Sequence, residues 1–308
     1  MIGTQILATG SALPKKIVDN IELANKVDTS DEWITSRTGI KQRHIVGVDE
    51  NALTLAYQAS INAISSGNIE ASDIDAVIVA TMTPAKEMPS TASLLQKELG
   101  LKPGIAFDIN VACSGFVYGL NIADMLIKSG PVKTVLLVGV DVMSRVLDWR
   151  DRSTCVLFGD GAGAAIIQEC SKNKLYGGIM GADGNFSDSL QASPKLTMEG
   201  REVFKHAVKE LENLVPLTLK KLGFNFEDID WLVAHQANIR IIHATARLLK
   251  LPIEKAIVTI DHHANTAAAS IPLALDHAIK TKQIQRGDLL FLEAFGAGFS
   301  WGSFILRY

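Results

Sequence analysis

The sequence has few cysteines and none of the spacings that bind metals. Its 308 residues include only three cysteines, Cys113, Cys155 and Cys170. They form no C-x-x-C motif, so we expect no metal site. An odd number of cysteines without a secretion signal is typical of a reducing compartment. The sequence therefore predicts free thiols and a cytoplasmic location.

Signals for membranes and nucleic acids are also missing. The best apolar run, residues 134–143, is much shorter than the roughly 18 residues of a membrane span. Residues 1–14 lack a basic start followed by a long apolar core, so they do not resemble a signal peptide. The net charge of −3 argues against bulk attraction to nucleic acid. We expect a globular protein with no membrane or nucleic-acid partner.

Short β-branched runs alternate with helical patterns along the chain. This alternation predicts an α/β fold with largely parallel sheets. The expected strands are 76–81, 105–110, 134–141, 231–236, 256–260, 289–295 and 303–308. The expected helices are 52–65, 91–99, 115–129, 202–222, 238–250 and 270–280.

The chain also repeats itself at half its length. "SDIDAVIVAT" begins at Ser72 and "EDIDWLVAHQ" begins at Glu227, a separation of 227 − 72 = 155 residues. A similar separation relates "KTVLLVGVD" to "GDLLFLEAFG". Two matches in the same order of elements favour a duplication. We expect similar halves at 1–170 and 171–308, with residues 171–200 as a connecting segment with its own loops.

Cys113 follows an expected strand and precedes an expected helix, in "DINVACSGFVYG". The unpaired N–H groups and the dipole at a helix amino end favour an anion. We therefore expect a lowered thiol pKa and a reactive thiolate. The alternative for a lone cysteine is a buried structural thiol.

The second half places polar residues at similar points. His235 and Asn238 follow a strand, and Asn265 lies at the approximate counterpart of the Cys113 turn. Active sites of open α/β sheets form beyond the carboxyl ends of strands, so two facing halves can unite Cys113, His235 and Asn265 in one cleft. Taken individually, His235 is more often a structural histidine and Asn265 more often a helix cap.

Two glycine-rich segments, residues 158–167 and 295–303, lead into strand patterns. They lack the strand–loop–helix context of a dinucleotide or P-loop site. We interpret them as tight turns at which the backbone must approach another part of the protein or a ligand closely. A main-chain N–H near Ala297 is suited to stabilising an oxyanion.

Six motifs together resemble those of one enzyme family. They are "TSDEWITSRTGIKQRHI", "DINVACSGFVYGL", "FGDGAGA", "AHQANIRI", "NTAAASIP" and "FGAGFSWGS". In this order, from Thr29 to near the C-terminus, they resemble β-ketoacyl-acyl carrier protein synthase III of the thiolase-like superfamily. The resemblance implies a five-layered αβαβα thiolase-like fold built from duplicated halves. It also implies a homodimer that needs its substrates but no cofactor.

The implied reaction is a decarboxylating condensation of an acyl-CoA primer, expected to be acetyl-CoA, with malonyl-acyl carrier protein, which initiates fatty-acid synthesis. By the resemblance, Cys113 carries the acyl group, and His235 and Asn265 assist decarboxylation. The main-chain amides of Cys113 and Ala297 form the oxyanion hole. The residues matching the coenzyme A site are Trp33, Arg37 and Arg152. Without the motif, ordinary surface packing would be the preferred explanation of these three.

Two further sets of residues are expected to contact the substrates. Arg240, Arg247 and Lys250 recur at i, i+7 and i+10, which predicts a basic helix face for an acidic carrier protein, joined by Lys205. A solvated charged face is the alternative. The family analogy gives an acyl pocket of Met88, Met143, Phe158 and Met198, with Met88 offered by a partner subunit. Methionines are equally good core fillers.

Three positions depart from the family pattern. Ala264 stands where glycine usually precedes the active-site asparagine, Ala297 interrupts a triple glycine, and Arg201 replaces a frequent asparagine.

Four rival functions follow from the same residues. A biosynthetic thiolase needs a second cysteine that "FGAGFSWGS" lacks. A related synthase or acyltransferase of secondary metabolism, a Cys-His-Asn thioester hydrolase and a non-catalytic acyl-binding protein remain open.

Overall fold

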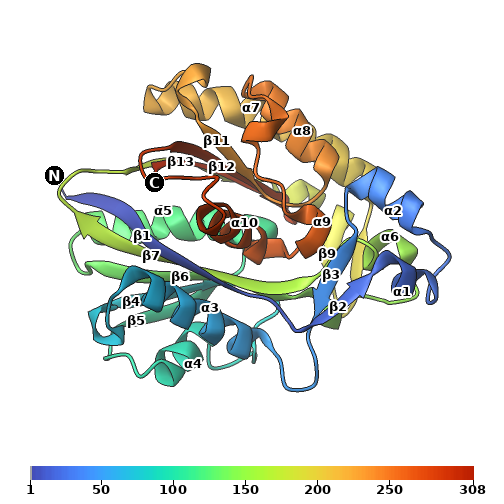
Figure 1. Ribbon diagram of the computed structural model, residues 1–308, viewed down its shortest axis with the longest axis horizontal. Helices are drawn as coiled ribbons and strands as arrows, with labels where there is room; N and C mark the ends of the chain where they lie inside the picture. The colour runs from blue at the N-terminus through green and yellow to red at the C-terminus, as the bar shows by residue number, and fades with distance from the viewer. Residues whose placement is uncertain (1) are drawn as a thin grey trace.

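The computed structural model describes residues 2–308 and contains two large β-sheets that share a layer of helices between them (Figure 1), besides two small two-stranded sheets. The first sheet has the strand order β1-β7-β6-β4-β5. The second has the order β11-β12-β13-β8. The strands of the first sheet are β1 (Gly3–Ala12), β4 (Ala76–Ala80), β5 (Ile105–Ile109), β6 (Thr134–Val142) and β7 (Asp160–Cys170). Those of the second are β8 (Leu175–Ala182), β11 (Trp231–Ala234), β12 (Leu289–Gly296) and β13 (Ser300–Arg307).

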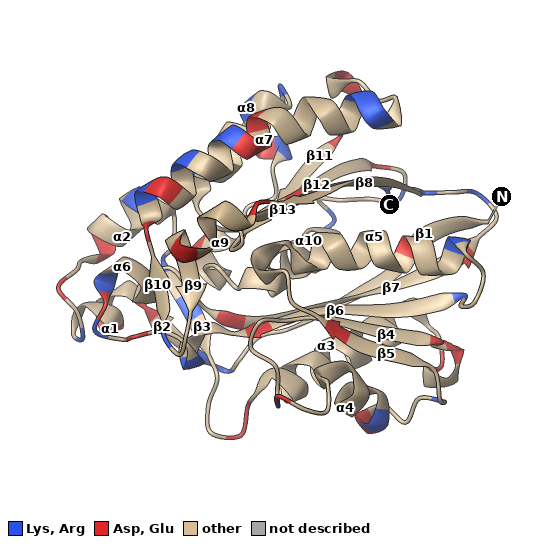
Figure 2. Cartoon of the chain, turned by 180° about the vertical axis from the view of Figure 1, so that it is seen from behind, with Lys and Arg blue, Asp and Glu red and all other residues tan. Residues whose placement is uncertain are grey.

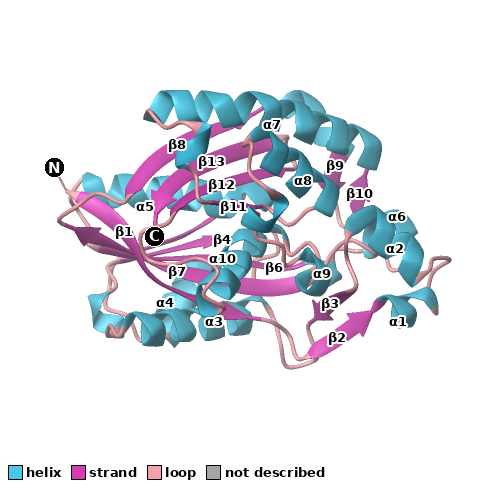
Figure 3. Ribbon diagram, turned by 45° about the horizontal axis from the view of Figure 1, so that its top comes forward, coloured by secondary structure: helices cyan, strands magenta, loops and turns pink. Residues whose placement is uncertain are grey.

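Helices form the other three layers (Figures 1 and 3). The outer face of the first sheet is covered by α3 (Ala52–Gly67) and α4 (Thr91–Glu98). Between the sheets lie α5 (Gly115–Lys128) and α10 (Ser270–Lys280). The second sheet is covered by α7 (Gly200–Leu222) and α8 (Ile239–Leu248). The order of layers is thus αβαβα, as expected.

Each sheet is buried on both faces, which explains its uninterrupted apolar strands. In β6, all nine residues are buried. Val135 and Leu137 join the core around α5 and α10, whereas Leu136 and Val138 join the core beneath α3 and α4. The period of two along the strand therefore supplies two different cores, and neither face requires polar residues.

The duplication is visible in the starting residues of equivalent elements. Adding 155 to the first residues of β4, α5 and β6 (76, 115 and 134) gives 231, 270 and 289, which begin β11, α10 and β12. The same offset relates the 3-10 turn at Ala112–Ser114 to the turn at Ala267–Ala269. The two sheets also share their strand order, since β8, β13, β12 and β11 follow one another as β1, β7, β6 and β4 do.

The expectation of largely parallel sheets is wrong, because both sheets are mixed. The parallel pairs are β4–β5, β4–β6 and β11–β12, while β1–β7, β6–β7, β12–β13 and β13–β8 are antiparallel. Segment 171–200 is also more than a connection, because it contains β8 at the edge of the second sheet.

The expected strand at 256–260 is reduced to a single bridge between Leu232 and Ala256. The buried side chain of Gln236 replaces the rest of the ladder. Its Oε1 accepts hydrogen bonds from the N–H groups of Thr259 (2.8 Å) and Ile260 (3.1 Å), and its Nε2 donates to Ile257 O (3.1 Å). Since this amide satisfies the backbone, the segment can turn into helix α9 (Ile260–His263).

The remaining elements gather at one end of the molecule (Figure 3). They are β2 (Lys16–Asp19), α1 (Asn20–Ala24), α2 (Asp31–Thr38), β3 (Gln42–Ile45), α6 (Arg152–Cys155), β9 (Leu190–Ala192) and β10 (Leu196–Met198). Among residues 2–308, no helix combines the length and the apolar character needed to cross a membrane.

Candidate active site

Cys113 lies in the short 3-10 turn between β5 and α5. The turn requires a positive φ of 44° at Ala112, a conformation uncommon outside glycine. This geometry brings Cys113 to the amino end of a 14-residue helix, with only 6% of its surface exposed. Ser114 is fixed beneath it, since its hydroxyl donates to Ser300 O on β13 at 3.1 Å. Both sheets therefore hold the turn that carries Cys113.

Asn265 occupies the related turn of the second half. Its N–H donates to Leu157 O and its carbonyl accepts from Gly159 N–H, both at 3.0 Å. Its side-chain Oδ1 accepts from Ala267 N–H at 2.9 Å, which leaves the amide N–H group for other partners. With the offset of 155, Asn265 corresponds to Asn110, and Cys113 to Ala268. The two turns therefore correspond only approximately, because the counterpart of Cys113 lies three residues after Asn265.

Ala264, directly before Asn265, has φ 59° and ψ −162°. This combination is found almost only at glycine, so the alanine is strained. The surrounding segment holds it, since Ala264 N–H donates to Ile260 O at 3.0 Å. The departure noted in the sequence thus lies at a backbone position for which glycine is suited.

His235 follows β11, where its N–H donates to Glu293 O at 2.8 Å. The side chain is buried, and Nδ1 has no hydrogen-bond partner among the residues described. Burial lowers the pKa of His235 to about 3. The imidazole is therefore neutral at physiological pH, and it keeps one ring N–H that can donate a hydrogen bond to a developing oxyanion.

One cavity of about 110 Å³ is lined by Cys113, His235 and Asn265 together. These residues come from different elements and from both halves of the chain. A second cavity of about 40 Å³ lies on the other side of Cys113, between Met143, Phe158 and Leu196. Cys113 and Phe158 line both cavities, so the sulfur lies where they approach each other.

The expected lowering of the Cys113 pKa is wrong. Burial, assisted by the nearby buried carboxyl of Asp141, raises the pKa of the thiol to about 12. Asp141 accepts hydrogen bonds from Met82 N–H (2.8 Å) and Ala268 N–H (3.0 Å), which ties together the turns of the two halves. In the closed site the thiol is protonated, and the helix dipole does not offset the loss of water.

The loop after β12 contacts the nucleophile directly. A Cβ placed on Gly296 would lie 2.8 Å from Cys113 N and 3.2 Å from Cys113 Cβ. Only glycine permits this approach. The next residue, Ala297, lines the small cavity beside Cys113. The backbone of this segment and that of the Cys113 turn are therefore in close contact beside the small cavity.

Comparisons with known proteins decide the family. Residues 107–184 match the family model for 3-oxoacyl-[acyl-carrier-protein (ACP)] synthase III, and residues 219–308 match the model for its C-terminal part. A curated β-ketoacyl-[acyl-carrier-protein] synthase III of Xanthomonas campestris pv. campestris is 49% identical, over 100% of this chain and 99% of that protein.

Solved structures agree. The crystal structure of 3-oxoacyl-[acyl-carrier-protein] synthase III from Aquifex aeolicus VF5 has a TM-score of 0.97 and 46% identity, covering 99% of this chain and 100% of that one. The corresponding enzyme of Pseudomonas aeruginosa PAO1 has a TM-score of 0.95 and 41% identity, covering 99% and 98%.

The chain belongs to the β-ketoacyl-[acyl-carrier-protein] synthase III family.

The resemblance to synthase III and the thiolase-like fold that it implied are therefore confirmed. The three residues expected to hold coenzyme A form one cluster. The guanidinium carbons of Arg37 and Arg152 lie 4.6 Å and 5.1 Å from the centre of the Trp33 ring. Arg152 Nη1 also donates to Asp28 O at 2.6 Å. The cluster joins α2 to α6, and stacked guanidinium groups beside an indole suit phosphates and an adenine ring.

The expected basic residues are exposed on the outermost layer, where Figure 2 shows Lys and Arg on α7 and α8. Arg240 lies 4.9 Å from the ring centre of Phe204, which lines the larger cavity, so it stands near the entrance. Lys205 follows Phe204 on α7. Lys250 lies beyond the end of α8 with φ 55°, so the expected single helical face holds only for Arg240 and Arg247. Arg201, the third departure, is exposed at the start of α7.

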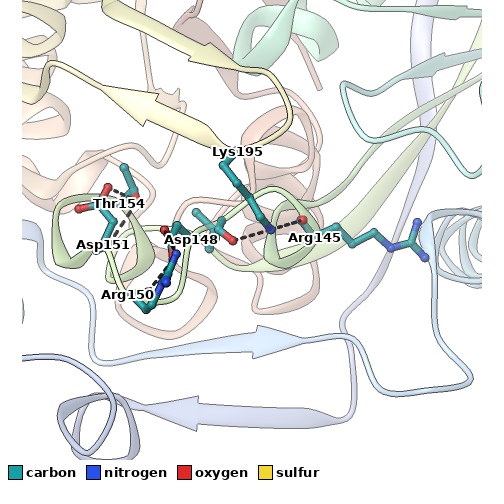
Figure 4. Close-up of polar contacts among 7 residues, drawn as sticks. Arg145, Asp148, Arg150, Asp151, Thr154 and Lys195 are labelled. Carbon is teal, nitrogen blue, oxygen red and sulfur yellow. Dashed lines mark hydrogen bonds and ion pairs between the residues drawn. The ribbon is translucent and has the colours of Figure 1, made fainter.

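The expected acyl-pocket residues divide between several places. Met143 and Phe158 line the small cavity, and Met198 lines the larger one. Met88 lines neither and is 82% exposed. The hairpin β9–β10 covers the small cavity through Leu190 and Leu196. Lys195 fixes that hairpin by donating to Arg145 O (3.1 Å) and Leu147 O (3.0 Å), beside the ion pair of Arg150 with Asp148 (Figure 4).

Sequence reasoning missed three buried polar residues around the site, Asp141, Gln236 and Glu293. Each is a polar residue within or next to an apolar strand, and that interruption was the available signal. As for metals, residues 2–308 contain no group of three His, Cys, Asp or Glu side chains arranged to hold an ion.

Proposed function

We propose that the chain condenses an acyl-CoA primer, with acetyl-CoA as the preferred one, with malonyl-acyl carrier protein through an acyl thioester on Cys113. The products are 3-ketoacyl-acyl carrier protein, coenzyme A and carbon dioxide, and the reaction initiates fatty-acid synthesis. The observation that carries the proposal is the shared cavity of Cys113, His235 and Asn265. Membership of the synthase III family supports the same reaction.

In the first step, the thiol loses its proton and the sulfur attacks the thioester carbon of the primer. The main-chain N–H groups of Cys113 and Ala297 donate to the oxyanion that forms. The bond to coenzyme A then breaks, and the departing sulfur takes a proton. Gly296 supports this role for the loop, since it allows the backbone to contact Cys113. Covalent catalysis of this kind divides a difficult condensation into two easier steps.

In the second step, the malonyl group loses carbon dioxide. The electron pair of the broken carbon–carbon bond passes into an enolate, whose oxygen accepts hydrogen bonds from neutral His235 and the Asn265 amide. The lowered pKa of His235 supports this neutral donor role. The enolate carbon attacks the acyl group, and the bond to the Cys113 sulfur breaks. The sulfur regains a proton, so the whole reaction consumes one proton.

The surroundings of the site support further assignments. Stacking of Arg37 and Arg152 on Trp33 supports coenzyme A binding there. The small cavity of about 40 Å³ supports a short primer, because it leaves little room beyond Met143. The exposed side chains of Arg240, Arg247, Lys250 and Lys205 support docking of an acidic carrier protein.

We also propose a cytoplasmic homodimer. Within the described residues 2–308, β5 pairs only with β4, so its other edge has no strand beside it. That edge carries Ile105, Phe107 and Ile109, which are only partly buried. A second copy that pairs along β5 would cover it. Met88 is exposed on the loop that precedes α4, and dimerisation would allow it to reach a partner's acyl pocket. Three free cysteines support a reducing compartment.

A panel of acyl-CoA esters tests the proposal. We expect intact-mass analysis to find acyl-Cys113 with acetyl-CoA, followed by a carbon–carbon bond and carbon dioxide after malonyl-acyl carrier protein is added. Cys113→Ser should abolish both steps, whereas the control Cys170→Ser should abolish neither, since Cys170 lies outside both cavities.

The products separate the alternatives. Release of free acid alone would favour a thioester hydrolase. Acyl transfer without carbon dioxide would favour an acyltransferase of secondary metabolism. Full function of Cys113→Ser would favour an acyl-binding protein, and the absence of acylation with every ester would contradict the proposal.

A further inference from the structure

Glu293 is a buried acid that faces the catalytic cavity and has no part in the reaction described above. Its residue is 1% exposed, and it pairs with Ala234 in the middle of the second sheet. Neighbours Phe291 and Phe295 on the same face contribute to cores beneath α7 and α8. Glu293 lines the same cavity as Cys113, His235 and Asn265. It is the only Asp, Glu, Lys or Arg in that lining among residues 2–308.

The Glu293 carboxyl group has one hydrogen-bond partner, the Thr245 hydroxyl, among residues 2–308. The Thr245 hydroxyl oxygen lies 3.1 Å from Glu293 Oε1 and 3.2 Å from Ile241 O. A hydroxyl has a single proton to donate. The Thr245 hydroxyl donates to Glu293 Oε1 and divides this proton with the Ile241 carbonyl. One shared hydroxyl offsets little of the cost of burying a charge, so burial favours the neutral carboxyl group. The second oxygen of Glu293 has no hydrogen-bond partner in residues 2–308 and is not fully enclosed, so it faces the cavity.

Among residues 2–308, no Lys or Arg lines the cavity to neutralise an ionised Glu293. From α7 and α8, the side chains that line the cavity are Val203, Phe204, Ala207, Leu211 and Ile241, all apolar. The lysines and arginines of these helices are all exposed; they are Arg201, Lys205, Lys209, Lys220, Lys221, Arg240 and Arg247. From the other elements, the titratable groups that line the cavity are Cys113 and His235, which rest uncharged. Burial raises the pKa of Glu293 to about 8, against the Thr245 contact, which lowers it.

We propose that Glu293 is a specificity-determining residue of the condensation: its neutral carboxyl group admits the carboxylate of the malonyl group to the cavity, and its ionised form excludes it. The proposal rests on the function proposed above, because that function brings an anion beside this acid. Two like charges in a dry cavity repel strongly, whereas a neutral carboxyl group only offers its dipole. The acyl-CoA primer carries no carboxylate at its acyl end, so its binding is insensitive to this charge.

The test is the pH dependence of the second step alone. Enzyme already acylated on Cys113 removes thiol ionisation from the measurement. With a pKa of about 8, only about a tenth of Glu293 is neutral at pH 9. If only that fraction admits the malonyl group, KM for malonyl-acyl carrier protein rises about tenfold between pH 7 and pH 9. KM for acetyl-CoA in the first step should stay constant over the same range.

Glu293→Gln keeps the shape and stays neutral, so its KM for malonyl-acyl carrier protein should be flat with pH and near the native value at pH 7. Glu212→Gln, an exposed acid on α7, is the matched control and should keep the native rise. The proposal is overturned if Glu293→Gln shows the same rise as the native enzyme, or if its KM at pH 7 is already tenfold higher. Absence of condensation by the native enzyme at pH 7 would instead contradict the proposed function.

A spectroscopic measurement on the native enzyme keeps the proposal testable if Glu293→Gln does not fold. Infrared difference spectra should contain the C=O band of a protonated carboxylic acid that disappears between pH 7 and pH 9. Asp141 does not interfere, because burial raises its pKa only to about 6. Loss of the band below pH 7 would overturn the proposal.

Discussion

Cys113 is subject to two opposing influences, and their magnitudes decide its resting state. The amino end of a helix stabilises an anion by about 0.3–2 kcal/mol. Burial, with a contribution from Asp141, raises the thiol pKa from 9.0 to about 12, which corresponds to about 4 kcal/mol. Burial therefore dominates, and the thiol stays protonated until a bound thioester draws the sulfur into reaction.

The reactivity of Cys113 should therefore increase steadily with pH. Below a pKa of about 12, the thiolate fraction grows about tenfold per pH unit. We expect the single-turnover rate of acylation by acetyl-CoA to rise in this way from pH 6.5 to 9. Intact-mass analysis at short reaction times measures this rate. A plateau near pH 7 would contradict the protonated resting state and support the low pKa that the helix position alone suggests.

Gly296 should be indispensable for acyl transfer. A methyl group there meets main-chain and Cβ atoms of Cys113 at 2.8–3.3 Å, which cannot move aside like the end of a flexible side chain. We expect Gly296→Ala to displace the Ala297 N–H and to reduce kcat for acylation roughly 100-fold, the usual effect of losing one oxyanion donor. Gly184→Ala is the control, since nothing lies within 4 Å of its added Cβ. Equal activity of the two variants would argue against an oxyanion hole at this loop.

At the scale of elements, the sequence predicted the helices whose own residues have a clear apolar periodicity. The helices α3, α5 and α10 begin at the expected residues, because their apolar faces pack on the sheets. The missed strands β1, β7 and β8 are rich in glycine and alanine, so their propensity is weak and the sheet provides their stability.

Other failures have tertiary causes. The expected strand at 256–260 depends on whether Gln236 or a neighbouring strand satisfies the backbone, which no local pattern reveals. The motifs found Cys113, His235 and Asn265, but burial in three dimensions determines the pKa values of the first two. The polar support around them, including Glu293 and Thr245, depends on contacts between elements far apart in the sequence.

Helix α9 should be sensitive to acid. His263 is buried, and its ring centre lies 4.2 Å from that of His262 and 6.2 Å from that of His277. Burial first, then repulsion from His262, His277 and His44, lowers its pKa from 6.5 to about 3. The unfolded chain binds this proton more readily, so the stability is present above pH 6.5 and is lost as pH falls toward 3.

We expect the free energy of unfolding to fall by up to about 1.4 kcal/mol per pH unit below 6.5 on account of His263. His263→Leu removes the titrating group together with an Nδ1 atom that has no partner among residues 2–308. Urea unfolding at pH 7 and pH 5.5 should therefore show a smaller loss for the variant than for the native protein. An exposed histidine, His243→Leu, is the control. Identical losses for all three proteins would exclude His263 as the cause.

At the scale of the whole molecule, five layers stack around the two large sheets, and among residues 2–308 the outer edge of β5 pairs with no strand. The edge at β5 lies beside a groove lined by Lys86, Glu87 and Phe107. If two copies pair there, the mass in sedimentation is 2 × 33.2 = 66.4 kDa at micromolar concentration. Phe107→Glu introduces like charges across the two-fold axis and should give the 33.2 kDa chain, with circular dichroism unchanged.

Loss of the dimer should also weaken the site, because Met88 would no longer reach the partner subunit. We expect Phe107→Glu to lower the rate of Cys113 acylation and to relax its preference among primers of different length. Val48→Glu is the matched control, since Val48 is a fully exposed apolar residue on the loop that precedes α3. It should keep both the mass and the primer preference of the native protein. A native protein that sediments as one chain at these concentrations would contradict the assembly, and a dimeric Phe107→Glu would move the interface elsewhere.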